Sequence, residues 1–310
     1  MKNINFVILG DNNIANELGK KGTTSDIAIY DRKTSHSIFT WALPLTFPDK
    51  VQTLMQVVNL AEYAILNVTK IDRHLGEQII ALDSVQFRDG FIVHSHDIDE
   101  ADLKSITRNT SVSNFKFVDD VAQLKNEISI LEPKPSEGPL MIPIDHAFDV
   151  KGVGTVVLGV MKQGSVRVHD QLKILPDGMD IIIKSIQVHD DPVNESKSPA
   201  RVGLALKGID VERISRGDVL SLPGYLKLSD GVITVKFKKN SYYKADLAEN
   251  QSYLISIGLQ IKPIKVRLIN EDEIEIIPEN PFVYFPGQKF AILKPDSSGT
   301  RIIGRGGFIE

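Results

Sequence analysis

Apolar residues along the chain follow two successive patterns. In the first 131 residues, short apolar runs alternate with longer segments whose apolar positions recur at helical spacing. The pattern predicts strands at 4–9, 27–30, 64–68 and 91–94, and helices at 13–18, 50–62, 76–86 and 119–131. Strands that alternate with helices usually build a mostly parallel sheet. We therefore expect an α/β domain over 1–131, with helices on both faces of its sheet.

The second pattern begins after a proline-rich stretch. LEPKPSEGPL, residues 131–140, holds three prolines and a glycine, which disfavour regular structure and predict a linker over 132–140. Beyond it, short β-branched or alternating runs are separated by Gly, Asp and Pro, as is typical of closed β-barrels. A further segment with turn residues, near 220–231, divides this part of the chain. We therefore expect one barrel over 141–224 and another over 225–310.

Composition narrows the function classes. The chain has 310 residues, 42% of them hydrophobic, which suffices for two or three domains with their own cores. It contains no cysteine, which excludes disulfides, thiolate metal sites and cysteine nucleophiles and favours a reducing compartment. No apolar run approaches the roughly 20 residues that span a bilayer, and the N-terminus lacks a signal-peptide pattern. We expect a cytoplasmic monomer with no membrane partner.

Charge gives a weaker indication. The formal net charge is −4, but residues 226–310 hold 12 basic and 10 acidic residues and are the part that leans basic. If nucleic acid binds, this third is the first candidate surface, although so small an excess is also typical of an ordinary solvated surface.

The segment VILGDNNIANE, residues 7–17, occupies the place of a phosphate loop. Such a loop reads G-x-x-x-x-G-K-[ST], because its glycines let backbone N–H groups surround phosphate, its lysine reaches the outer phosphates and its hydroxyl holds magnesium. Gly10 fits the first position, whereas Ala15, Asn16 and Glu17 replace the second glycine, the lysine and the hydroxyl residue. GTP or GDP with magnesium is therefore a doubtful cofactor, and Gly10 is a weak nucleotide-binding candidate.

Other nucleotide motifs are equally incomplete. GKKGTT, residues 19–24, offers glycines, lysines and hydroxyls, but it follows the predicted helix and is interpreted as a helix end with a solvated turn. TKID, residues 69–72, resembles a guanine-specificity motif but comes one strand–helix unit too early. The later strand runs into HSHD, residues 94–97, where Asp97 is the remaining candidate for a guanine edge. Asp97 could equally cap a helix over 99–108.

Residues 143–220 carry the most specific motifs. They are KGVGTVV (151–157), HDQLKI (169–174), IQVHD (186–190), RVGLALKGID (201–210) and RGDVL (216–220). In this order they resemble the second domain of translational GTPases of the elongation factor Tu type, and they are similar to the selenocysteine-specific factor and its SelB-like paralogues in methanogenic archaea. With lower specificity, 226–310 resemble the third domain and 1–131 the GTPase domain. The resemblance implies a P-loop-GTPase-like α/β domain followed by two β-barrels.

The resemblance also locates what is missing. The family's magnesium-linked D-x-P-G-H motif falls on LPLTF, residues 43–47, which lacks the aspartate, the glycine and the histidine. Together with the missing loop lysine and hydroxyl, this removes phosphate neutralisation, magnesium and water activation at once. We expect a degenerate GTPase domain, a pseudo-GTPase, with no catalytic residue and no metal ligand to assign.

The barrels retain candidate binding groups. In the family, the aminoacyl end of tRNA lies on the second domain, and the resemblance places Asp145, His146, Phe148, His189 and Arg201 at that pocket. Arg201 supplies a fixed fork of donors, His146 can donate or accept, and Phe148 would give a stacking wall. The alternative is a hydrogen-bonded turn with Phe148 in the core.

A second set lies in the last third of the chain. Charge and aromatic rings alternate at Lys238, Lys239, Tyr242, Tyr243 and Lys244, as in surfaces that neutralise phosphates and stack on bases. They are candidates for contacts with the tRNA backbone. Alternation along a strand would instead place some of them in the core and the others in water.

These observations favour a translation elongation-factor-like protein that binds aminoacyl-tRNA, the ribosome or both, does not bind DNA, and has weakened or lost GTP binding and hydrolysis. Two alternatives stay open. One is an unconventional GTPase that uses Gly10, Asp97 and backbone contacts. The other is a regulatory or scaffold protein that presents Leu43, Leu45 and Phe47 as an exposed apolar patch.

Overall fold

The protein is described by a computed structural model that covers residues 1–249, 251–270 and 272–309. Its residue contacts form two compact units. The first unit comprises residues 1–133, 239–244 and 291–305, and the second comprises 134–238, 245–290 and 306–310. The three-domain division expected at 131/132, 140/141 and 224/225 stays a prediction, although 131–140 contain no helix or strand.

A seven-stranded sheet forms the centre of the first unit. Its strands are β1 (Lys2–Gly10), β2 (Lys20–Thr24), β3 (Ile27–Lys33), β4 (Ser37–Pro44), β5 (Tyr63–Val68), β6 (Gly90–His94) and β7 (Lys116–Val118). They lie in the order β2-β3-β4-β1-β5-β6-β7. Strands β4, β1, β5, β6 and β7 run parallel, and β2 and β3 add an antiparallel edge.

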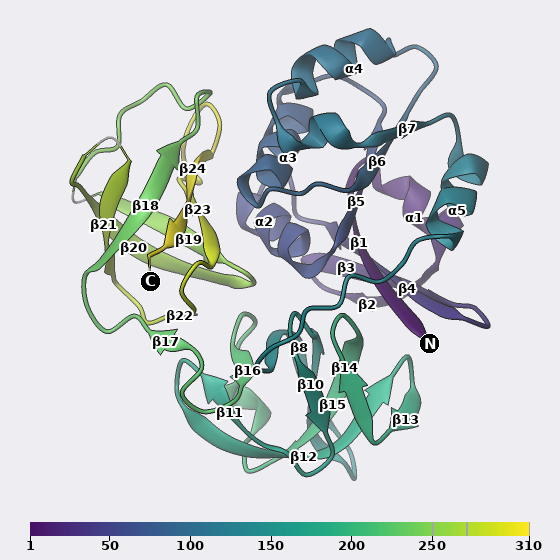
Figure 1. Cartoon of the computed structure of the whole chain (residues 1–310), viewed down its shortest axis with the longest axis vertical. Coiled ribbons are helices and arrows are strands. Elements are labelled where there is room, and N and C mark those ends of the chain that lie inside the picture. Colours follow the sequence, from purple (N-terminus) through teal and green to yellow (C-terminus); the bar gives the residue numbers. More distant parts are fainter. Residues whose placement is uncertain (250, 271, 310) are drawn as a thin grey trace. The chain divides into compact units, whose positions relative to one another are not determined.

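Helices cover both faces of this sheet, as predicted (Figure 1). They are α1 (Ala15–Leu18), α2 (Val51–Leu60), α3 (Arg73–Ser84), α4 (Glu100–Thr107) and α5 (Val121–Ser129), with short 3₁₀ turns at Asn12–Ile14 and Ser111–Asn114. Ile4, Phe6 and Ile8 of β1 share a core cluster with residues of α1 and α5. Asp72 and Asp120 cap α3 and α5 by accepting backbone N–H groups, which satisfies donors that a helix start leaves unpaired.

Three strands of this region, β2, β4 and the three-residue β7, were not predicted from the sequence. GKKGTT was expected to end a helix, but residues 20–24 form the edge strand β2. Its residues are mostly exposed, so it lacks the apolar alternation that marks a half-buried strand. Strand β4 was not predicted; every one of its residues is buried, and a strand buried on both faces shows no alternation either.

The first of the two barrels lies within the second unit. Its elements are β8 (Met141–Val150), β9 (Gly154–Val160), β10 (Ser165–Arg167), β11 (Gln171–Leu175), β12 (Met179–Val188), β13 (Asp191–Val193), β14 (Glu195–Lys197), β15 (Arg201–Lys207) and β16 (Val219–Ser221), with a 3₁₀ turn at Val211–Arg213. The strand order is β11-β16-β8-β9-β15-β12-β13, and pairing of β11 with β12 closes the barrel. Ile142, Val157, Ile183 and Leu204 belong to its apolar core.

The second barrel is built from β18 (Ile233–Lys239), β19 (Ser252–Ile257), β20 (Gln260–Leu268), β21 (Glu273–Pro278), β23 (Lys289–Leu293) and β24 (Ile302–Phe308). It closes in the order β18-β21-β20-β19-β23-β24, and the short strands β17 (Lys227–Leu228) and β22 (Val283–Tyr284) pair separately. A mixed, helix-covered sheet followed by two closed barrels confirms the predicted fold class.

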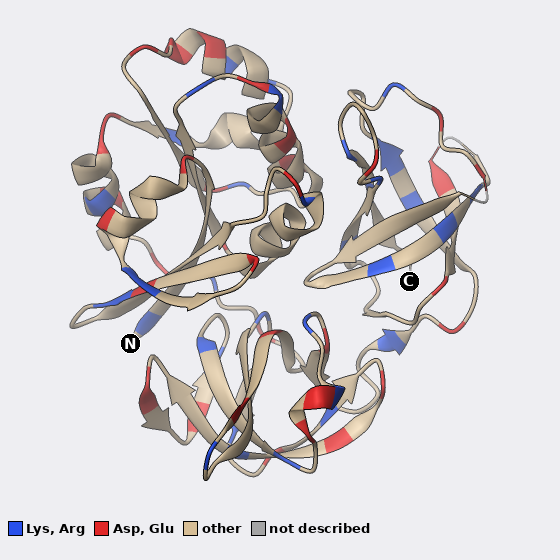
Figure 2. Ribbon diagram, turned by 180° about the vertical axis from the view of Figure 1, so that it is seen from behind, with Lys and Arg blue, Asp and Glu red and all other residues tan. Residues whose placement is uncertain are grey.

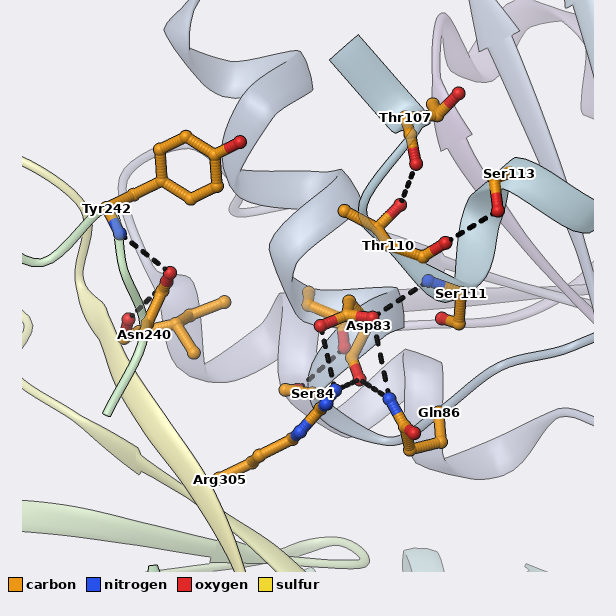
Figure 3. A network of polar contacts seen from close by, with 12 residues as sticks. Asp83, Ser84, Gln86, Thr107, Thr110, Ser111, Ser113, Asn240, Tyr242 and Arg305 are labelled. Atoms are coloured by element: carbon orange, nitrogen blue, oxygen red, sulfur yellow. Dashed lines mark hydrogen bonds and ion pairs between the residues drawn. The ribbon is translucent and has the colours of Figure 1, made fainter. Parts of the chain in front are cut away.

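Two arginines of the first unit bind carboxylates of α3. Arg301 donates from Nε to both carboxylate oxygens of Glu77, at 3.1 and 3.2 Å, and its Nη1 donates to the Pro48 carbonyl at 2.7 Å. Arg305 donates to the Asp83 carboxylate at 2.7 Å, and the Ser111 N–H donates to the same carboxylate at 2.8 Å (Figure 3). The bonds from the two arginines join segments that lie more than 200 residues apart in the sequence.

Candidate functional site

The connection after β1 is where a phosphate loop would lie, and it is very short. Asp11 alone separates β1 from the 3₁₀ turn, and α1 has four residues. Gly10 has φ +86°, and a Cβ placed there would lie 1.9 Å from the Asn67 carbonyl oxygen. The glycine is therefore required by the close approach of β5, a reason that is independent of any phosphate.

Neighbouring groups already use the polar atoms of this connection. The Asp11 N–H donates to the Asn67 carbonyl at 2.8 Å, and the Asn67 side-chain amide donates back to the Asp11 carbonyl at 2.9 Å. The Asp11 carboxylate accepts the Asn13 N–H at 2.9 Å. This backbone donor at the start of the 3₁₀ turn is therefore already bound to a carboxylate of the chain itself. Sequence reasoning missed Asn67, because its role depends on the parallel pairing of β1 with β5.

Asp97 lies exposed in the turn after β6. The expected alternative, that Asp97 caps the next helix, is wrong: Asp99 caps α4 by accepting the Ala101 N–H at 2.8 Å. Asp72 of the TKID sequence caps α3 and pairs with Lys70 at 2.9 Å. The structure therefore gives two of these three aspartates a structural role and leaves Asp97 available to a ligand.

The LPLTF segment does not present a continuous apolar patch. Leu43 is buried in β4, while Leu45 is 40% exposed. Phe47 is half-buried, meets the His74 ring edge-on at 5.9 Å and lies 5.7 Å from the Arg301 guanidinium carbon. Burial of Leu43 counts against the scaffold hypothesis, which required Leu43, Leu45 and Phe47 to be exposed together.

A cavity of about 700 Å³ occurs elsewhere in the first unit. The first turns of α3, Tyr242, Pro295 and residues 297–301 line it, together with Ile106 and Thr110. Gly10 and Asp97 are not among its lining residues. The cavity is therefore separate from the nucleotide position that the sequence suggested.

A polar cluster lies on β8, where the strand is irregular. The register with β9 shifts between Ile144 and His146, so Asp145 is the extra residue of a β-bulge. Bulges redirect a side chain and locally interrupt strand pairing. Here the Asp145 side chain is fully buried and meets Arg201, the first residue of β15. The structure thus brings together two residues that lie 56 positions apart in the sequence.

Arg201 binds Asp145 with two nitrogens. Its Nη2 donates to Asp145 Oδ1 at 2.8 Å and its Nε to Oδ2 at 3.2 Å. His146 Nδ1 lies 2.7 Å from the same Oδ1. The side chains of His146 and Arg201 keep 13% and 17% of their surface exposed, whereas Asp145 keeps none. A ligand would therefore meet the donors and not the carboxylate.

The charge of Asp145 is stabilised in place. Burial by itself would raise the pKa of Asp145, but the Arg201 charge and the hydrogen bonds from His146 and Arg201 outweigh it. The pKa therefore lies below its ordinary value of 3.8. The carboxylate is ionised at neutral pH and keeps Arg201 in a fixed orientation.

The other two candidates for the aminoacyl pocket, Phe148 and His189, differ in their exposure. Phe148 is 41% exposed on β8, so the expectation that it belongs to the core is wrong and a stacking role stays available. His189 lies half-buried in the turn between β12 and β13, with φ +50°. Gln187 pairs with Gly203, so this turn follows β12 toward the end of β15 that carries Arg201.

The proposed tRNA backbone set is divided by burial. Tyr243 is buried and lies beneath Lys239 Nζ, 5.8 Å from the ring centre, so its ring cannot stack on a base. Tyr242 is 56% exposed, and Lys238 and Lys244 are exposed as well. Basic and acidic residues are interspersed over the ribbon rather than gathered on one basic stripe (Figure 2). Part of the set is buried, but Tyr242, Tyr243 and Lys244 follow the end of β18 at Lys239, so alternation along a strand is not the cause.

The described residues hold neither a cluster of metal ligands nor a membrane-spanning helix. Within 1–249, 251–270 and 272–309, no group of three or more His, Asp or Glu side chains is arranged to hold a metal ion. In the same residues, no helix combines the length and apolar character needed to cross a membrane.

Comparison with known proteins identifies the family. Residues 154–221 match the family model of elongation factor Tu domain 2. An uncharacterized protein of Methanocaldococcus jannaschii is 34% identical over 94% of this chain and 95% of its own length. The selenocysteine-specific elongation factor of the same organism is 30% identical over 85% of this chain. The chain is similar to the SelB-like group of translational GTPases. It spans 62% of the length of that elongation factor.

Solved SelB structures have the same fold. SelB of Methanococcus maripaludis, in complex with the GTP analogue GppNHp, superposes with a TM-score of 0.86 at 24% identity, over all of this chain and 79% of its own. The apo form of the same protein gives 0.83 at 25% identity, over all of this chain and 80% of its own. The fold and the relatives together support a role as a translation factor.

Proposed function

We propose that this SelB-like protein binds aminoacyl-tRNA through its first barrel, without requiring GTP, and that the ribosome is its second partner. The likeness to selenocysteine-specific elongation factors supports the class of partner. The cluster of Asp145, His146 and Arg201 is the single observation that carries the proposal, because it combines a fixed arginine with an accessible edge.

The chemistry of the cluster suits the aminoacyl end of a charged tRNA. Asp145 engages two of the three guanidinium nitrogens, and Nη1 of Arg201 makes no further hydrogen bond within the described part of the chain. A donor held by a buried carboxylate is already oriented, so binding loses little side-chain entropy. Exposed Phe148, on the same strand as His146, supplies an apolar surface beside the donors.

Independence from GTP rests on the connection after β1. A phosphate would have to displace the paired Asn67 and Asp11 groups, and neither a lysine nor a hydroxyl follows at the positions that hold the outer phosphates and magnesium. Each missing charge-assisted bond would be worth about 1.5–3 kcal/mol. We therefore propose that binding and hydrolysis of GTP are weakened or lost in this protein.

Filter binding tests the tRNA proposal. A mixture of charged and deacylated tRNAs would be presented to the wild-type protein at moderate salt, because phosphate contacts alone weaken as salt rises. We expect preferential retention of charged tRNA and loss of that preference in Arg201→Lys, which keeps the charge but not the bidentate fork. Arg213→Ala, an exposed residue of the Val211–Arg213 turn, is the matched control and should retain the preference. Equal and negligible retention of both tRNA pools by the wild type would contradict the proposal.

Calorimetry tests the nucleotide proposal. Titration of GTP or GDP with magnesium into the wild-type protein should give no measurable binding at micromolar concentrations. A micromolar dissociation constant would contradict nucleotide independence and favour the unconventional GTPase that uses Gly10 and Asp97.

A further inference from the structure

The bulge that carries Asp145 is fixed by the turn before β16. The Gly217 N–H donates to the Ile144 carbonyl at 3.0 Å, and the Ile144 N–H donates to the Asp218 carbonyl at 2.8 Å. Arg216 Nε donates to the carbonyl of Asp145 itself at 3.0 Å. The turn formed by residues 216–218 therefore binds the backbone on the N-terminal side of the bulge and at the bulged residue.

The hydrogen bond from Arg216 satisfies the Asp145 carbonyl group in the bulge. An extra residue in a strand is left without a ladder partner, and a buried carbonyl without a donor is costly. Asp145 is only 1% exposed, so water is a poor substitute. Arg216 thus favours the bulged conformation over a regular strand, and a one-residue change of register would turn the side chain to the opposite face.

The other side of the turn is also fixed, within the same unit. Gly217 has φ +96°, and a Cβ there would lie 2.9 Å from the Leu259 carbonyl oxygen and 3.1 Å from the Gln260 Cα. Gln260 is held in turn, because its side chain both donates to and accepts from the Val283 backbone, at 2.8 and 2.9 Å. The turn consequently lies against a rigid neighbour and has little room to relax away from the bulge.

We infer that Arg216 is a positioning residue for the site on the first barrel: it sets the backbone of Asp145 and, through that carboxylate, the orientation of Arg201. This inference rests on the proposed function for its consequence in tRNA binding, but the geometric part stands by itself. Arg216 acts through Asp145, so its removal should disturb Arg201 without removing any group that touches the ligand.

Nuclear magnetic resonance tests the geometric part without RNA. The side-chain Nε–Hε signal of Arg201, assigned by its loss in Arg201→Lys, reports on the bond to Asp145. In Arg216→Ala we expect this signal to move and its exchange with water to accelerate at least about tenfold, as a loosened buried hydrogen bond would. Arg216→Lys, which keeps a donor, should restore part of the protection. Arg213→Ala, three residues away and exposed, should leave the signal unchanged.

Binding measurements test the consequence. The ratio of affinities for charged and deacylated tRNA should fall about tenfold in Arg216→Ala, which corresponds to one charge-assisted hydrogen bond. An unchanged Arg201 signal in folded Arg216→Ala would overturn the inference, whatever the tRNA result. A changed signal in a protein that binds no tRNA would support the positioning role and refute the proposed function instead. If Arg216→Ala does not fold, Arg216→Gln, which retains a neutral donor, takes its place in the same comparison.

Discussion

Asp145 and Arg201 illustrate what a buried ion pair contributes at the scale of single residues. A carboxylate with no exposed surface loses its hydration, and the two bonds from Arg201 offset much of that loss. Replacement of both partners by apolar groups is often tolerated, whereas removal of one partner leaves a buried charge unpaired. The pair is therefore better explained by orientation of Arg201 than by stability.

A double-substitution experiment separates these two roles. Arg201→Met alone should lower the free energy of unfolding by about 3–5 kcal/mol, because Asp145 stays buried without its partner. Arg201→Met combined with Asp145→Leu should recover most of that loss but should not restore binding. Urea denaturation gives the free energies. A double variant as unstable as Arg201→Met would show that the pair is needed for the fold itself.

Acid should weaken the same cluster. The pKa of Asp145 lies below 3.8 in the folded protein, because the Arg201 charge and two hydrogen bonds outweigh burial. A lowered pKa stabilises the fold above the unfolded value near 3.9, and this contribution is lost as pH falls through the folded pKa. Urea midpoints measured from pH 7 to pH 2.5 should therefore drop most steeply below about pH 4. Asp145→Asn should show a shallower drop, and an identical acid slope in both proteins would refute this assignment.

Among the elements, the sequence predicted the buried strands that form short apolar runs, near 4–9, 27–30, 64–68 and 91–94. It missed β4 (SIFTWALP), whose buried residues include Ser37 and Thr40, and β2 (KKGTT), which contains no apolar run. Phe148 was misjudged for another reason: the bulge at Asp145 shifts the register, and the strand beyond it is largely solvent-exposed. The placement of Asp145 and Arg201 at one pocket came from family resemblance, because no local pattern links residues so distant, and their ion pair emerged only from the structure.

The close approach of Gly10 in β1 to Asn67 in β5 predicts how a substitution at Gly10 changes the free energy of unfolding. Gly10→Ala should cost roughly 1–3 kcal/mol for its positive φ and more for the contact with the Asn67 carbonyl. Gly152→Ala is the matched control, since Gly152 has φ +84° with open space around its Cβ position. Urea denaturation followed by circular dichroism gives the free energy of unfolding of both variants, and the one tryptophan of the chain, Trp41, fully buried in β4, reports unfolding of this sheet by fluorescence. Equal destabilisation by both substitutions would contradict the close approach of Asn67.

For the whole molecule, we propose that the fold is retained where nucleotide chemistry is not. The sheet and its helices depend on apolar faces and on helix caps such as Asp72 and Asp120, none of which requires a phosphate. The connection after β1 uses Asn67 and Asp11 to satisfy its own backbone groups. Sequence reasoning anticipated the missing lysine and hydroxyl, but the replacement contacts emerge only once β1 and β5 are paired in space.

The dependence of aminoacyl-tRNA affinity on GTP tests this account most directly. The dissociation constant would be measured once with GTP and magnesium and once with a chelator and no nucleotide. If binding is independent of nucleotide, charged tRNA should bind specifically in both conditions, with dissociation constants that differ by less than about twofold. A GTP-dependent increase of about fivefold or more, where allosteric coupling normally begins, would contradict it, as would the absence of binding in both conditions.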